Sequence, residues 1–246
     1  MKPFLKLTYT ELKLQLREPV GLFFTLAFPV MLMVLFGLIF GNEAETFLGG
    51  YGQVDLSVPG YIGMIIGTIG MLSIPLSIAT YRENGVLRRL RATPVQSKSI
   101  LWSQVAAQTI IALLGIALLV ITGLLLFDLR LPSGGDVMIL PGILLSAFSF
   151  FAIGFVLAGV MPTPRTAQAV GMAIFFPMLF LSGAAMPRFI MPEGVQEVAK
   201  LLPLTQVVIL LEDLWLRGEW NVTAVAVITA VLILGLIISR FTFRWE

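Results

Sequence analysis

Residues 58–80 read VPGYIGMIIGTIGMLSIPLSIAT, and residues 81–96 read YRENGVLRRLRATPVQ. The first stretch has 23 residues and no Asp, Glu, Lys or Arg, so it is long enough for a helix to cross the hydrocarbon core of a bilayer. The second stretch carries four arginines. An uncharged span followed at once by a basic segment is typical of a helix that ends at the cytoplasmic face of a membrane.

Five more uncharged apolar stretches occur along the chain. With the first they predict six transmembrane helices, at 20–41, 58–80, 102–127, 138–161, 167–187 and 221–239. The whole chain is 58% hydrophobic and only 12% charged, whereas an ordinary soluble domain is about 25% charged. We therefore predict an all-α integral membrane protein in which residues 1–246 form one transmembrane domain.

The distribution of basic residues predicts the orientation. With the N-terminus placed inside, 12 of the 16 lysines and arginines fall in the inside segments. The positive-inside rule then places both termini in the cytoplasm, and we expect a multi-pass protein of the plasma (inner) membrane. Because the basic residues lie at membrane boundaries, they do not indicate a nucleic-acid partner.

The N-terminal segment carries an apolar stripe and an adjacent basic stripe at helical spacing: Leu5, Tyr9, Leu12 and Leu16, and then Lys6, Lys13 and Arg17. This pattern predicts an amphipathic helix that lies on the membrane surface. A basic segment that only orients the first span would have the same composition.

Residues 188–219 form the longest external segment. It is apolar at helical spacing but is interrupted by Pro192 and Pro203. Such a short and broken stretch predicts interfacial or re-entrant-like helices before the last span, not a seventh span.

Four glycines of the second span fall within one narrow arc of a helix: Gly60, Gly63, Gly67 and Gly70. Without side chains on this arc, another backbone can approach closely. The partner helix could belong to this chain or to a second copy.

Several kinds of chemistry are disfavoured. The chain has no cysteine and no histidine, which removes the commonest metal ligands and acid–base groups. Glu212 and Asp213 are adjacent carboxylates but lie about 100° apart on a helix, so they do not face each other. We do not expect an enzyme. The spans also lack the ionisable groups that secondary carriers usually keep in the membrane, so energy for transport would come from elsewhere.

The cytoplasmic segment after the second span has two sides. Leu87 and Leu90 form an apolar side, and Arg88, Arg89 and Arg91 form a basic side. A helix of this kind is suited to docking into a groove of a cytoplasmic partner. A solvated basic loop that serves only the orientation is the alternative.

Two motifs carry a resemblance to a known family. The pattern R-E-x-G-x-L-x-x-L-x-x-T-P occupies Arg82, Glu83, Gly85, Leu87, Leu90, Thr93 and Pro94. Residues 176–187 read FPMLFLSGAAMP and are followed by Pro192 and by Pro203-Leu204-Thr205. These motifs and the arrangement of spans resemble the type-2 ABC export permeases, above all the bacterial drug exporters, over essentially the whole chain.

The resemblance implies the membrane subunit of an ATP-binding cassette exporter. Such a permease pairs with a second copy or a sister chain and with two ATPase subunits. This chain has no G-x-x-x-x-G-K-[ST] phosphate loop, so ATP and Mg are expected in the partner and no cofactor is expected here. The implied ATPase contacts are Arg82, Glu83, Gly85, Leu87, Arg88, Leu90, Arg91, Thr93 and Pro94, with Pro164 and Arg165 as a second contact. The N-terminal helix would brace the ATPase, and the broken helices would cap the outer end of the pathway.

Aromatic and methionine side chains are frequent in spans one and five, and such surfaces accept varied apolar ligands. They suggest a hydrophobic or amphipathic substrate, although lipid contact and helix packing would explain the same residues. Gln104 and Gln108 could line a polar seam or could bond to neighbouring helices. The candidate pathway residues are Phe28, Met31, Gln104, Gln108, Phe176 and Ser182. The alternatives are a stand-alone channel or secondary carrier, and a membrane scaffold that binds a cytoplasmic partner.

Overall fold

The computed structural model describes residues 3–44, 49–86, 89, 97–132, 136–185 and 191–242. In this part of the chain all regular structure is helical, and no strand occurs. Six segments are long and apolar enough to cross a membrane, which confirms the predicted number of spans. They are Phe23–Phe40, Gln53–Glu83, Ser99–Phe127, Met138–Val160, Pro164–Leu181 and Val222–Thr242.

The first two spans each contain a π-helical turn. The first consists of the π turn η1 (Phe23–Ala27) and α3 (Phe28–Phe40), and it continues directly from α2 (Pro19–Leu22). The second consists of α4 (Gln53–Thr68), the π turn η3 (Ile69–Ser73) and α5 (Ile74–Glu83). The other spans are α7 (Ser97–Phe127), α8 (Asp136–Val160), α9 (Pro164–Leu181) and α12 (Val222–Thr242). Outside them lie α1 (Pro3–Gln15), α10 (Glu193–Ala199), α11 (Pro203–Glu212) and a third π turn, η5 (Asp213–Arg217).

The second and fifth spans differ most from their predicted bounds. The second span begins five residues earlier than expected and continues to Glu83, so it includes Asp55 and Arg82. Both side chains are bonded to other helices or loops, and these partners allow charged residues inside a long helix. The fifth span begins at Pro164 and ends at Leu181 instead of residue 187. Thr163 caps its start, because its Oγ1 accepts a bond of 3.2 Å from the Thr166 N–H, and proline is well suited to the first helical position.

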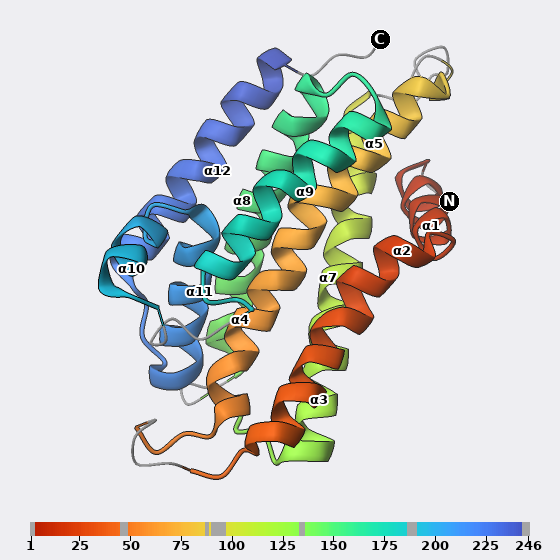
Figure 1. The fold of residues 1–246 in the computed structure, drawn as a ribbon. Helices are drawn as coiled ribbons and strands as arrows, with labels where there is room; N and C mark the ends of the chain where they lie inside the picture. The colour runs from red at the N-terminus through yellow and green to blue at the C-terminus, as the bar shows by residue number, and fades with distance from the viewer. Residues whose placement is uncertain are drawn as a thin grey trace.

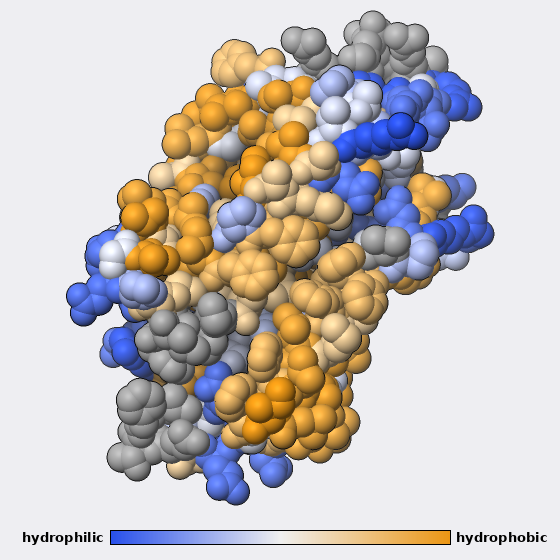
Figure 2. All heavy atoms as spheres, viewed as in Figure 1, coloured by the Kyte–Doolittle hydropathy of each residue, from blue (hydrophilic) through white to orange (hydrophobic). Residues whose placement is uncertain are grey.

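The helices form one bundle with α1 and the last turn of α12 at the same end (Figure 1). The second span lies at its centre: 78% of its apolar stretch is buried, against 22% in Phe23–Phe40 and 17% in Val222–Thr242. On the face seen in Figure 2, hydrophobic residues cover the middle of the molecule and hydrophilic ones gather towards its two ends. We call the end that carries α1 the terminal end and the other the opposite end.

The helices before the last span are broken, as predicted. Residues Glu193–Ala199 and Pro203–Arg217 form a pair bent by 100°. Most of α11 is buried, including Leu204 and Leu211, where it packs against α4 and α12. The short helix α11 is therefore covered by other helices. Breaks in a helix are tolerated in a membrane protein where the irregular backbone is buried in protein and not exposed to lipid.

The first two spans share a π turn followed by a proline. In each π turn the next N–H bonds to a carbonyl five residues back, from Phe28 to Phe23 O and from Ile74 to Ile69 O. A proline follows each of these residues, Pro29 and Pro75, and has no N–H to donate to the carbonyls behind it.

Glycines of neighbouring helices lie against the carbonyl groups to which these prolines cannot donate a hydrogen bond. Gly115 of α7 faces Thr25 O, four residues before Pro29, at 3.4 Å from an added Cβ. Gly171 of α9 faces Met71 O, four residues before Pro75, and Gly154 of α8 faces Gly70 O, five residues before Pro75. A Cβ added at either glycine would come closer than 3.0 Å to the carbonyl oxygen that it faces. Such close backbone approach permits weak Cα–H···O contacts and needs glycine.

The four glycines of α4 and η3 contact four different parts of the same chain. Gly60 lies against residues 183–184, Gly63 against Val208 of α11, Gly67 against Phe175 of α9, and Gly70 against Phe150 of α8. The glycine arc therefore lets the central span be surrounded by helices of its own chain.

We expect Gly154→Ala and Gly171→Ala each to lower the free energy of unfolding by about 1–3 kcal/mol, because the new methyl group would overlap a backbone carbonyl that cannot move away. Thermal unfolding in mild detergent would measure this. Gly194→Ala is the control, since nothing lies within 4 Å of its added Cβ. Equal stability of all three variants would contradict the close packing.

Candidate functional site

The end of α5 is bonded to two other elements by consecutive residues. The Tyr81 hydroxyl donates to Glu11 Oε2 of α1 at 2.6 Å. The Arg82 guanidinium donates from Nη1 to Met161 O and from Nη2 to Ala158 O, both at 2.9 Å. These are carbonyls at the C-terminal end of α8, where a helix has free acceptors and a partial negative charge. The end of α5 is therefore held to both α1 and α8.

Helix α1 has three distinct faces. Its inner face, which includes Thr8, Glu11 and Leu12, is buried or partly buried, and the helix packs on α7. An apolar stripe remains exposed along α1 and the turn that follows it: Leu5, Tyr9 and Leu16. The cations Lys6, Lys13 and Arg17 are exposed as well. Burial raises the pKa of the Glu11 carboxyl above its ordinary value, although the bond from Tyr81 acts in the opposite direction.

The described members of the predicted ATPase contact lie at the terminal end. Glu83 is exposed, and Arg165 is exposed on the first turn of α9, which begins at Pro164. Gly85 has a φ of 64° and open space around it, so its backbone conformation is what requires glycine there. The other predicted contact residues lie outside the described part of the chain: Leu87, Arg88, Leu90, Arg91, Thr93 and Pro94.

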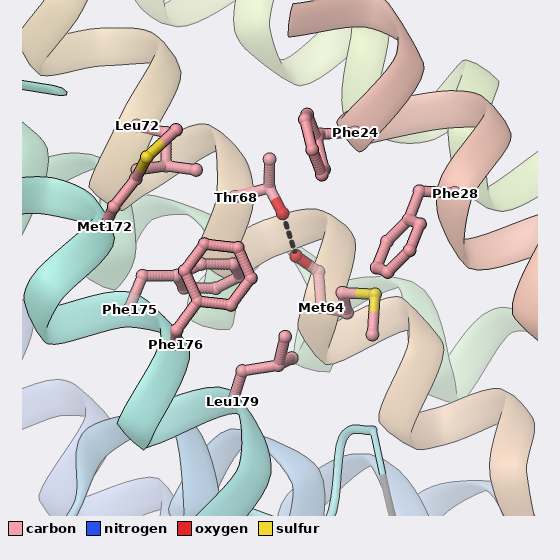
Figure 3. A pocket seen from close by; sticks show the side chains of 9 residues that line it. All are labelled: Phe24, Phe28, Met64, Thr68, Leu72, Met172, Phe175, Phe176 and Leu179. Carbon is pink, nitrogen blue, oxygen red and sulfur yellow. Dashed lines mark hydrogen bonds between the residues drawn. The ribbon is translucent and has the colours of Figure 1, made fainter.

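A small apolar pocket lies between the first, second and fifth spans (Figure 3). Its lining comprises four phenylalanines, two methionines, two leucines and one threonine: Phe24, Phe28, Phe175, Phe176, Met64, Met172, Leu72, Leu179 and Thr68. The Thr68 hydroxyl donates to Met64 O of its own helix at 2.8 Å. The pocket therefore presents almost no free polar group to a ligand.

The predicted pathway residues do not all meet at this pocket. Phe28 and Phe176 line it from α3 and α9. Gln104 and Gln108 are buried elsewhere on α7, where Gln104 Nε2 donates to Ser77 Oγ of α5 at 3.1 Å. Ser182 is buried at the end of α9, and its Oγ donates to Leu179 O. Met31 lies half-exposed on the side of the bundle.

A second polar cluster, the Asp55 cluster, closes the opposite end. It comprises Asn42, Asp55 and Arg130 with the backbone groups they bind. Asp55 is 1% exposed, and its carboxylate accepts from the Arg130 N–H at 2.9 Å, from Asn42 Nδ2 at 3.1 Å and from the Gly52 N–H at 3.3 Å. Asn42 Oδ1 accepts from the N–H groups of Val54 and Asp55, so the loop after the first span caps the start of α4.

The third π turn is attached to this cluster. Trp215 Nε1 donates to Arg130 O at 3.1 Å, and the Tyr51 hydroxyl donates to Leu216 O at 2.8 Å. The loops after the first and third spans and the segment before the last span are thereby held together.

Comparison with known proteins assigns the family. Residues 3–214 match the family model described as ABC-2 type transporter. The chain belongs to this family. The protein is thus a membrane permease component of an ABC transporter. Membership of this family implies association with an ATP-binding cassette ATPase.

Several proteins named as transporters or transport permeases are similar in sequence to this permease over much of its length. The protein ycf38 of Porphyra purpurea, named as a transport permease, is 26% identical over 92% of this chain and 79% of its own length. YhhJ of Escherichia coli, named as an inner membrane transport permease, is 27% identical over 65% of this chain and 43% of its own length. ABC transporter G family member 20 of Dictyostelium discoideum is 23% identical over 73% of this chain and 24% of its own length.

Sequence reasoning missed the two polar clusters of the permease. Asp55 follows Gly52 at the spacing of a capping box, a pattern that could have predicted the start of a helix there. Nothing in the sequence indicates that Asn42 and Arg130 contact Asp55. Likewise, Glu11 and Tyr81 are 70 residues apart, and no local pattern connects them.

We expect Glu11→Gln to remove a pH dependence of α1 docking. The ordinary pKa of 4.5 is raised in the folded chain, so α1 binds most stably below about pH 4.5 and more weakly as the pH rises through the native value. Glutamine carries no charge and can still accept the bond from Tyr81.

Amide hydrogen exchange of residues 3–15 would measure this, with the variant compared with the wild type at each pH so that the intrinsic exchange rate cancels. Glu18, whose pKa burial also raises, is present in both proteins. The same pH dependence in both would contradict the assignment to Glu11.

Proposed function

We propose that this chain is the membrane-spanning subunit of an exporter driven by ATP hydrolysis in a separate subunit. Family membership supports a permease working with an ATP-binding cassette ATPase. The chain has no phosphate loop, and its spans offer few ionisable groups that could couple transport to an ion gradient. In this proposal two ATPase subunits and a second permease chain, identical or related, complete the transporter, and ATP and Mg bind to the ATPase subunits.

The observation that carries the proposal is the grouping of exposed polar residues at the terminal end. Glu83 is exposed at the end of the second span, and Arg165 is exposed on the next junction at the same end, beside the end of α8 that Arg82 binds. We infer that this end faces the cytoplasm of a cell with an inner membrane and contacts the ATPase. The exposed apolar and basic stripes of α1 fit the headgroup layer of that membrane face.

The pocket supports an apolar substrate class. Its aromatic and methionine lining offers dispersion contacts, and its one hydroxyl is already bonded. A sugar polymer would need free hydrogen-bonding groups that these residues do not supply. We therefore propose that uncharged hydrophobic or amphipathic molecules pass along the first and fifth spans and leave the cell at the opposite end.

We expect an ATPase with a phosphate loop to co-purify stoichiometrically with the tagged chain from native membranes in mild detergent. Glu83→Lys and Leu87→Asp should each lose this partner while the permease remains inserted, because they alter the proposed docking segment. Mass spectrometry of the purified complex would identify the partner.

Glu219→Lys is the matched control, because it makes the same charge reversal at an exposed residue of the opposite end. It should retain the ATPase. Recovery of the wild-type chain alone would remove the ATP-driven proposal and favour a channel or carrier.

We expect Phe176→Ala to raise the KM for an apolar fluorescent dye roughly tenfold in the reconstituted transporter, since a large pocket contact is lost. Phe180→Ala is the control: Phe180 lies one turn further along α9, is 53% exposed and does not line the pocket. Equal KM values for the two variants would exclude the pocket from the substrate path.

A further inference from the structure

The last turn of α5 is held on two sides by side chains that are adjacent in sequence. Tyr81 reaches α1 through the 2.6 Å bond to Glu11, and Arg82 reaches the end of α8 through two bonds of 2.9 Å. Met161, one of the two acceptors, is followed by the short turn that leads to Thr163 and α9. A movement of α5 therefore acts on α1 and on the α8–α9 junction together.

The contact between α1 and α5 is made by polar groups where apolar packing would hold two helices more simply. Glu11 is partly buried, so its carboxylate has lost part of its water shell and gains the hydroxyl of Tyr81 in exchange. Buried or half-buried polar pairs of this kind contribute little net stability compared with hydrophobic residues, and their best-attested role is to specify one arrangement. The apolar stripe of α1 is instead left exposed.

The position of this contact gives it a direction of action. Tyr81 and Arg82 lie in the last turn of α5, which ends at Glu83, and the chain turns at Gly85. A movement of this end of α5 therefore reaches both contacts directly. The two acceptors, Glu11 and the end of α8, belong to the other elements that lie at the terminal end.

We propose that Tyr81 and Arg82 form a strap that transmits movement of the end of α5 to α1 and to the α8–α9 junction. In this proposal Tyr81 and Glu11 are positioning residues of the transport cycle. The proposal rests on the proposed function, in that the movement is driven by a partner ATPase. It assigns to Arg82 a role inside the permease, distinct from a direct contact with that partner.

The test combines three variants of the Tyr81–Glu11 pair with two measurements. Tyr81→Phe removes one hydroxyl, Glu11→Ala removes the acceptor, and Glu11→Gln retains an acceptor. Hydrogen exchange of residues 3–15 in the purified permease reports the contact itself. Dye transported per ATP hydrolysed in the reconstituted complex reports transmission.

We expect Tyr81→Phe and Glu11→Ala to increase exchange in α1 and to lower transport per ATP on the order of fivefold or more, with the double variant no worse than either. Glu11→Gln should keep both the exchange of α1 and the transport per ATP at the wild-type values. Thr10→Ala is the control, because Thr10 is exposed and its hydroxyl bonds only within α1.

Two results would overturn the strap. One is unchanged exchange of α1 in Tyr81→Phe; the other is increased exchange with transport per ATP unchanged, which would make the contact a static anchor. Failure of the proposed function is separately visible as a wild-type permease that purifies without an ATPase. That result would end the transmission role while leaving the measured α1 contact intact.

Discussion

The close approach of the first two spans to their neighbours involves two prolines that cannot donate hydrogen bonds. Pro29 and Pro75 each follow a π turn and leave carbonyls of η1 and η3 without an N–H from the proline position. In lipid such groups need protein around them. Glycines of α7, α8 and α9 cover them, so the two spans can carry irregular backbone without exposing it. The apolar pocket lies beside the same two turns, with Phe24 from η1 and Leu72 from η3 in its lining.

The two ends of the bundle follow one physical rule. A charged side chain that is withdrawn from water needs partners, and both Asp55 and Arg82 find them on elements distant in sequence. At the opposite end the Asp55 carboxylate and the Asn42 side chain hold loops together. At the terminal end Tyr81 and Arg82 hold α1 and α8 to α5. Polar contacts thereby set the relative positions of elements at the ends, while apolar and glycine contacts set them along the spans.

Much of the fold could be predicted from hydropathy, because a bilayer demands about 20 apolar residues per helix and the chain shows this pattern six times. Prediction failed at the start of the second span for the same reason: Asp55 reads as the end of an apolar stretch unless its partners are known. The residues of the terminal-end contact were readable in part. Arg82 and Glu83 belong to a recognisable motif, whereas Tyr81 draws attention only when Glu11 is seen beside it.

The sequence by itself determined the number of spans, the broken helices before the last one and the resemblance to a family of permeases, because these follow from local hydropathy, proline positions and short motifs. Only the tertiary structure decided which carbonyl meets which glycine, that Asn42 caps α4, and that Phe28 and Phe176 share a pocket while Gln104 and Gln108 do not line it. Each of these contacts joins residues far apart in the chain. Their pairing is set by how whole helices pack, and no local pattern records it.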